Sequence, residues 1–136
     1  MNYWLLKTEP ETFSWDELVK KGSTMWDGVR NYQARNNLRK MLVGELALFY
    51  HSVKNPAVIG IAKITKEHYS DPTAKQGDWS VVDVAPVQKL DNSIALSDIK
   101  SNPKLSNMVL VKNSRLSVQP VTKEEFDEVL KMASGS

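Results

Sequence analysis

The most informative stretch of this chain reads WDGVRNYQARN and runs from Trp26 to Asn36. It combines two aromatic residues, three side-chain amides, two arginines, an aspartate and a glycine. A segment this polar rarely builds a core, but its planar groups suit a flat ligand with hydrogen-bonding edges. Aromatic rings stack on nucleobases, guanidinium groups stack or bind phosphate, and amides read base edges. The stretch therefore predicts a pocket for a nucleobase.

The length and composition of the chain predict a single cytoplasmic domain. Its 136 residues are the usual size of one domain, and a hydrophobic share of 41% supplies one core. Cysteine is absent, which excludes disulfides and thiolate metal sites. The sequence shows no apolar run of membrane length and no signal-peptide pattern. We place the domain at residues 1–132 and expect residues 133–136 to form a disordered tail.

The charge of the chain permits nucleic-acid binding without demanding it. The formal net charge is only +2, so contacts with phosphates must come from a local cluster of cations. Such a cluster is compatible with the crowding of Arg30, Arg35, Arg39 and Lys40.

Two capping boxes predict where helices begin. Ser14 with Glu17 predicts a helix over residues 15–21, and Thr122 with Glu125 predicts the last helix of the chain. In each box the side chains of the two residues satisfy backbone N–H groups that the first turn leaves without partners.

The remaining pattern is an irregular mixture of strands and helices. Apolar and β-favouring runs predict strands over residues 3–8, 45–53, 57–65, 79–89 and 115–121. Further helical segments are expected over residues 32–42 and near 94–99. Gly60, inside one strand, predicts a bulge or the close approach of another group. Without βαβ regularity, this order favours an α+β fold with a strongly bent sheet or small barrel.

Patterns typical of catalysis are weak. The chain has two histidines, His51 and His68, and lacks a nucleophile elbow, a phosphate loop and a dinucleotide fingerprint. His51 and Ser52 are neighbours on a strand, so they point to opposite faces. Two distant histidines also argue against a metal site. We therefore predict no catalytic residue, no metal and no cofactor.

The tryptophans allow more than one interpretation. Trp15, on the first turn of a predicted helix, is interpreted as a core residue. Trp26 and Trp79 lie among polar residues, so each is a candidate for a pocket wall or for the core. Tyr50 and His51 end a strand and line either the rim of a pocket or a hydrogen-bonded barrel rim.

Motifs along the whole chain match one known family in the right order. They are YWLLKTEP at 3–10, WDGVRNYQARN at 26–36, FYHS at 49–52, Trp79 with VDV at 82–84, and RLSV at 115–118. The sequence resembles the EVE domain family, a branch of the PUA-like superfamily that is related to the thymocyte nuclear protein and to the YTH readers. The resemblance implies a small, partly open mixed β-barrel of about six strands with three or four flanking helices.

The resemblance also implies a function for the pocket at the barrel mouth. Members of the family are thought to bind modified bases, particularly 5-methylcytosine and its oxidised forms in DNA, whereas the YTH readers hold methylated adenine of RNA in an aromatic cage. Bacterial members are often tied to defence against modified foreign DNA. We therefore expect a monomer that binds DNA or RNA with a modified base, with DNA favoured, alongside a separate effector protein and without membrane contact.

The predicted site draws on distant parts of the chain. The residues expected to bind the base are Trp26, Asp27, Gly28, Val29, Arg30, Asn31, Tyr50, His51, Ser52 and Trp79. The residues expected to hold flanking phosphates are Lys7, Arg30 and Arg35. Trp26 would stack on the base, Tyr50 or Trp79 would close the other side, and Asp27 would accept the amino group of cytosine.

Entry of a base into such a pocket requires an unpaired or flipped nucleotide, because a stacked base cannot reach it.

Two alternative functions would use the same pocket. The protein would bind a small nucleoside-like molecule, or it would be a hydrolase in which Lys7, Glu9 and His51 act as acid–base groups.

Overall fold

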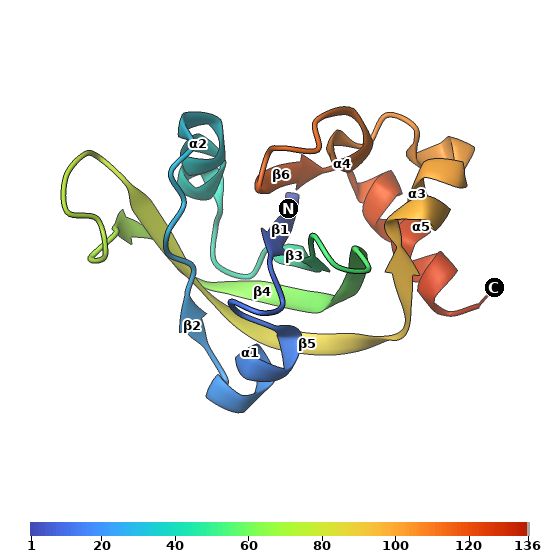
Figure 1. Ribbon diagram of the computed structural model, residues 1–136, viewed down its shortest axis with the longest axis horizontal. Coiled ribbons are helices and arrows are strands. Elements are labelled where there is room, and N and C mark those ends of the chain that lie inside the picture. The colour runs from blue at the N-terminus through green and yellow to red at the C-terminus, as the bar shows by residue number, and fades with distance from the viewer. Residues whose placement is uncertain (136) are drawn as a thin grey trace.

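A strongly curved sheet of six strands forms the centre of the protein, which the computed structural model describes over residues 1–135 (Figure 1). The strands are β1 (Tyr3–Thr8), β2 (Thr24–Met25), β3 (Leu46–His51), β4 (Ala57–Ser70), β5 (Ser80–Ala95) and β6 (Val118–Val121). Their order is β2-β5-β4-β3-β1-β6, in which β1 and β3 are parallel and the other pairs antiparallel. The edge strands β2 and β6 do not pair with each other, so the barrel stays partly open, as predicted.

Five α-helices flank the sheet within the described residues. They are α1 (Trp15–Lys21), α2 (Tyr32–Lys40), α3 (Leu96–Ser101), α4 (Val109–Lys112) and α5 (Lys123–Ala133), with a 3-10 helix η1 at Pro103–Leu105. Both predicted capping boxes are present, at Ser14 with Glu17 and at Thr122 with Glu125. The helices outnumber the three or four expected because α4 has only four residues, too few for a helical pattern to show in the sequence.

The hairpin of β4 and β5 is longer than the sequence predicts. The two strands pair from Ala57 with Ala95 to Ser70 with Ser80, with several register shifts. The outer part of β4 is mostly exposed and polar, so it lacks the apolar alternation that marks a strand. The loop at residues 71–79 joins the far ends of the two strands and projects from the body of the protein beside α2 (Figure 1).

Gly60 marks the close approach that its position in a strand predicted. A Cβ atom at this position would lie 2.7 Å from the ring of Trp15, a distance that Cβ atoms in proteins essentially never show. Trp15 is buried as expected, and the pairing of β4 with β5 shifts register between Val58 and Gly60. The glycine therefore lets the first turn of α1 pack directly on the sheet.

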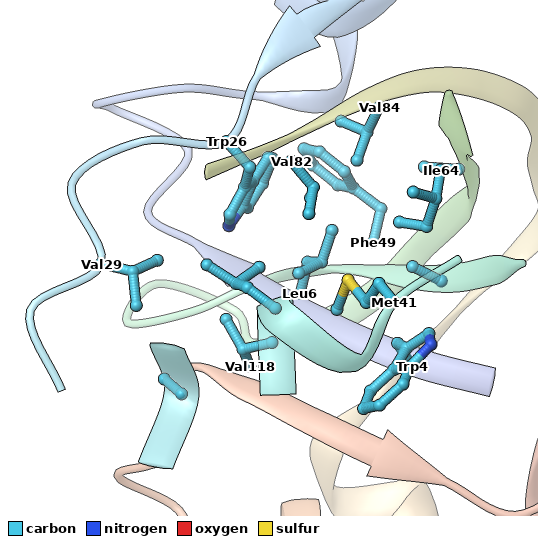
Figure 2. Packing of buried hydrophobic residues seen from close by; sticks show 14 of the residues in the cluster. Trp4, Leu6, Trp26, Val29, Met41, Phe49, Ile64, Val82, Val84 and Val118 are labelled. Carbon is cyan, nitrogen blue, oxygen red and sulfur yellow. The ribbon is translucent and has the colours of Figure 1, made fainter. Parts of the chain in front are cut away.

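Two hydrophobic clusters lie on opposite faces of the sheet, and β1 supplies both. Trp4 and Leu6 point into the first cluster, whereas Leu5 points into the second, as the alternation of side chains along a strand requires. The first cluster contains Trp26 beside Phe49 and is shown in Figure 2. No helix within residues 1–135 is long and apolar enough to cross a membrane.

The C-terminal end differs from the tail predicted for residues 133–136. Ala133 is the last residue of α5 and is only 3% exposed, because it packs in the second cluster. The N–H of Gly135 donates to the carbonyl oxygen of Met132 at 3.2 Å. Ser136 lies outside the described residues.

Candidate nucleic-acid interface

A cavity of about 700 Å³ opens between the end of β1, the segment around β2 and the β4–β5 hairpin. Its lining includes six of the residues that the sequence predicted for the site, namely Lys7, Trp26, Asp27, Gly28, Val29 and Arg30. Residues that the sequence reasoning missed complete the lining: Thr8, Thr12, Phe13, Lys21, Ser23, Thr24, Met25, Tyr69, Asp83 and Ser117. We call this the base cavity, after the ligand that the sequence predicts for it.

Residues 27–30 form one wall of the base cavity, and Asp71, which does not line the cavity, holds this wall in place. Its buried carboxylate accepts hydrogen bonds from the backbone N–H of Gly28 at 3.0 Å and from Nη1 of Arg30 at 2.9 Å. The other carboxylate oxygen accepts from the N–H and the hydroxyl of Thr73, at 2.7 and 2.6 Å. Burial alone would raise the pKa of Asp71, but hydrogen bonds from Thr73, Arg30 and Gly28 outweigh it and lower the pKa to about 2.

This anchor was missed because Asp71 precedes a proline and looked like an ordinary turn residue. Gly28 has φ +79°, a left-handed conformation in which an L side chain is strained. The glycine and the carboxylate together hold the loop in one shape, with Asp27 on the cavity side. Asp27 is exposed and makes no hydrogen bond or ion pair within residues 1–135, so its oxygens are free to accept from a ligand.

A second pair of groups in the base cavity is Tyr69 with Asp83. The Tyr69 hydroxyl donates to Oδ1 of Asp83 at 2.5 Å. This hydrogen bond, together with desolvation, raises the pKa of Tyr69 to about 12. Tyr69 was missed because the strand predicted from the sequence ends at residue 65, whereas β4 continues through Tyr69.

Trp26 belongs both to the core and to the lining of the base cavity, and the stacking role stays a prediction. Only 7% of the residue is exposed. Its ring meets Phe49 at 5.6 Å and Phe13 at 6.1 Å, both nearly perpendicular, and Figure 2 shows it among the core residues. Trp26 therefore forms the floor of the base cavity, while the half-buried ring of Phe13 lines it beside Trp26.

Tyr50 and Ser52 do not line the base cavity, contrary to the prediction. They lie in a second cavity of about 440 Å³, which shares Lys7, Thr8 and Ser117 with the first. Lys7 stands between the two cavities: its Nζ donates to the carbonyl oxygen of Ser114 at 2.6 Å and lies 5.7 Å from the Tyr50 ring centroid. Burial lowers the pKa of Lys7 and raises that of Tyr50.

The side chains of His51 and Asn31, both expected at the base, accept hydrogen bonds from the first turns of helices. Nε2 of His51 accepts the backbone N–H of Trp15 at 3.1 Å, which ties the start of α1 to β3. Burial lowers the pKa of His51, which is consistent with a neutral acceptor. Asn31 is the N-cap of α2, where its side chain accepts the N–H of Ala34 at 2.9 Å. Neither residue lines either cavity.

Trp79 and Arg35 lie outside both cavities, on the surface beside α2. The Trp79 ring stacks on Tyr32 with centroids 5.1 Å apart and an interplanar angle of 20°. Arg35 lies over both rings, and Arg30 lies over Trp79. Trp79 was expected to close the base cavity, but in the structure it does not line it.

Only two of the three residues named for a hydrolase share a cavity. Glu9 and Lys7 line the second cavity, whereas His51 lies elsewhere with its Nε2 engaged by α1. In the part of the chain that the structure describes, no three His, Asp or Glu side chains are grouped to hold a metal ion.

Comparison with known proteins identifies the family. A model of the EVE domain matches residues 2–132. The chain belongs to the EVE family. Thymocyte nuclear protein 1 of Homo sapiens is 42% identical over an alignment 165 residues long, which covers 96% of this chain and 73% of the human protein. The resemblance predicted from the motifs is thereby confirmed.

Solved structures share the architecture of this EVE domain. A protein from Agrobacterium tumefaciens is 46% identical with a TM-score of 0.95, covering 98% of this chain and 93% of that chain. Human THYN1, in complex with DNA containing 5-methylcytosine, is 41% identical with a TM-score of 0.91 and 98% of both chains covered. A YTH domain of Zygosaccharomyces rouxii, at 17% identity and a TM-score of 0.60, shares the fold.

Proposed function

We propose that this EVE domain binds nucleic acid and accepts one flipped or unpaired modified base, 5-methylcytosine in DNA above all, in the base cavity. The observation that carries the proposal is the wall from Asp27 to Arg30, which Asp71 holds rigid around a cavity large enough for a nucleoside. The DNA complex of the human relative supports the choice of ligand.

The chemistry of the cavity suits a cytosine ring. The free carboxylate of Asp27 accepts the exocyclic amino group, a donor that cytosine has and thymine lacks. The half-buried Phe13 and the floor at Trp26 supply apolar surface for the ring and its methyl group. A buried methyl contributes about 0.8 kcal/mol, or roughly fourfold in affinity, so preference over plain cytosine is modest.

Lys7 and Lys21 line the cavity and supply positive charge for the phosphates next to the base. Arg30 is less free than predicted because Asp71, Thr73 and its neighbouring carbonyl already accept its N–H groups. The affinity for oligonucleotides should therefore fall as the salt concentration rises.

The test is a titration of the protein with short labelled single-stranded DNA that carries 5-methylcytosine, cytosine or thymine at one position. Thymine keeps the methyl group and lacks the amino group, which makes it the matched ligand. Wild type should prefer 5-methylcytosine to thymine, and Asp27→Ala should lose most of that preference, roughly 5- to 150-fold. Asp91→Ala is the matched control because Asp91 is exposed and lines neither cavity.

Equal binding of all three oligonucleotides by wild type would overturn the proposal. Thermal stabilisation by the free nucleoside, with no salt-dependent binding of oligonucleotides, would instead assign the cavity to a small molecule. Trp26→Ala is not used, because removing a core tryptophan costs about 3–5 kcal/mol of stability. We further propose that the domain is a monomer without catalytic activity that works beside a separate effector protein.

A further inference from the structure

Four side chains cluster on the surface beside the base cavity, and we call this cluster the aromatic platform: Arg30, Tyr32, Arg35 and Trp79. The Tyr32 and Trp79 rings are stacked 5.1 Å apart. The Arg35 guanidinium lies 5.0 Å from the Tyr32 centroid and 5.8 Å from that of Trp79. Tyr32 is nevertheless 68% exposed, so the stack leaves a large aromatic surface open to solvent.

The platform is held in place by the loop at residues 71–79. Gly77, with φ +91°, lies so near Trp79 that a Cβ atom there would be 2.7 Å from the indole Nε1. Nη1 of Arg35 donates to the carbonyl oxygen of Asp78 at 3.1 Å. Helix α2 and the loop therefore fix the rings from two sides, and little conformational entropy remains to be lost on binding.

Packing of the helix does not explain this arrangement. Helix α2 already has an N-cap at Asn31 and buries Ala34 and Leu38 in the first cluster. A tyrosine that stays 68% exposed adds little hydrophobic stabilisation. An open ring with an arginine beside it is, in contrast, the arrangement that binds unpaired bases by stacking.

The platform is continuous with the base cavity through Arg30, which lines the cavity and lies 5.7 Å from the Trp79 ring centroid. Its charge also suits nucleic acid. Arg35 makes no ion pair within residues 1–135, whereas Arg30 is paired with Asp71 and Arg39 with Asp78. The acceptors of the Arg35 guanidinium are neutral oxygens, those of the Asn36 side chain and the Asp78 carbonyl, so no carboxylate neutralises its charge.

We propose that the aromatic platform stacks the base adjacent to the one in the base cavity, with Tyr32 as the stacking surface and Arg35 on the phosphate between the two nucleotides. This inference rests on the proposed function, and it makes the ligand a segment of unpaired nucleic acid that spans at least two nucleotides. An isolated modified nucleoside would use the cavity alone.

The test is a mutant cycle between Tyr32 and the neighbouring base. Wild type, Tyr32→Ala and Tyr32→Phe are titrated with single-stranded DNA carrying 5-methylcytosine, with an intact or an abasic nucleotide on its 5′ or its 3′ side. We expect Tyr32→Ala to weaken binding of the intact strand by roughly 5- to 150-fold. On one of the two abasic strands, Tyr32→Ala should bind as tightly as wild type, because the base that Tyr32 stacks is missing there. Tyr32→Phe keeps the ring and should bind the intact strand like wild type. Val87→Ala, which removes an exposed apolar side chain outside both cavities, is the control.

The outcomes separate this inference from the proposed function. If Tyr32→Ala binds the intact strand as tightly as wild type, or loses the same factor on every abasic strand, the platform does not stack a base and the inference is wrong. The preference for 5-methylcytosine over thymine reports on the cavity alone and is measured in the same titrations. If wild type shows no preference for 5-methylcytosine over thymine, the proposed function itself is overturned.

Discussion

Replacing Asp71 by asparagine tests whether one buried carboxylate holds the wall of the base cavity. Asparagine has nearly the same shape but offers one acceptor oxygen in place of two. In wild type each oxygen accepts two hydrogen bonds, one pair from Gly28 and Arg30 and the other from Thr73. In the variant the amide NH₂ must face one of these pairs, so two donors lose their acceptor.

The size of the effect follows from which donors can reach water. A buried donor without a partner costs about 1–3 kcal/mol. The Arg30 side chain is 38% exposed and Thr73 is exposed, so their side chains recover part of the loss from solvent. We expect Asp71→Asn to lower the free energy of unfolding by about 2–3 kcal/mol at neutral pH. For a domain of this size that is a fall in Tm of roughly 6–12 °C.

The dependence on pH gives an independent check. The pKa of Asp71 is lowered in the folded protein from 3.8 to about 2. A lowered pKa means that the ionised carboxylate stabilises the fold above the unfolded pKa, and that this stabilisation is lost as the pH falls toward 2. The difference in stability between wild type and Asp71→Asn should therefore be constant above about pH 5 and should narrow below about pH 4.

The assay is urea unfolding of wild type, Asp71→Asn and the control Asp91→Asn across this pH range. Asp91 is exposed and, over the described residues, its side chain makes no hydrogen bond or ion pair. A loss below about 0.5 kcal/mol in Asp71→Asn at neutral pH, the size typical of ordinary surface substitutions, would refute the anchoring role. A loss that does not change with pH would refute the assigned ionisation.

Three further outcomes are expected. Gly60→Ala should destabilise the protein by about 1–3 kcal/mol in urea unfolding, because the new methyl would overlap the Trp15 ring; an unchanged midpoint would contradict the close packing. In an alkaline ultraviolet titration, Tyr69 should ionise near pH 12, and Asp83→Asn should lower the pKa of Tyr69. A titration curve that is the same in wild type and in Asp83→Asn would argue against the hydrogen bond. Lys7→Met should reduce the slope of log affinity for DNA against log salt by roughly 0.7–0.9, one phosphate contact; an unchanged slope would remove Lys7 from the interface.

Local elements were predictable because their determinants are neighbours in the chain. The capping boxes at Ser14 and Thr122 start α1 and α5 as predicted. Gly60 showed a close approach, although the sequence could not name Trp15 as the partner. The outer β4–β5 hairpin was underestimated because polar residues there pair through the backbone and show no apolar alternation.

The site was predictable in part. Residues 26–30 are contiguous, so their unusual composition was visible, and the structure does place them around one cavity. Tyr50 and Ser52, expected at the same site, line the second cavity instead. Phe49 and Tyr50 point to opposite faces of β3 and enter different clusters, which the alternation of a strand already implies.

The sequence by itself determined the family, the helix starts and the segment that forms the cavity wall, because each depends on residues a few positions apart. Only the tertiary structure decided what holds that wall, since Asp71 is 43 residues from Gly28 and binds it from the loop between β4 and β5. It also decided the roles of the aromatic residues. Burial assigns Trp26 to the floor, and the meeting of α2 with a distant loop creates the stack of Tyr32 on Trp79. The two rings are far apart in the sequence, so no local pattern indicates that they meet.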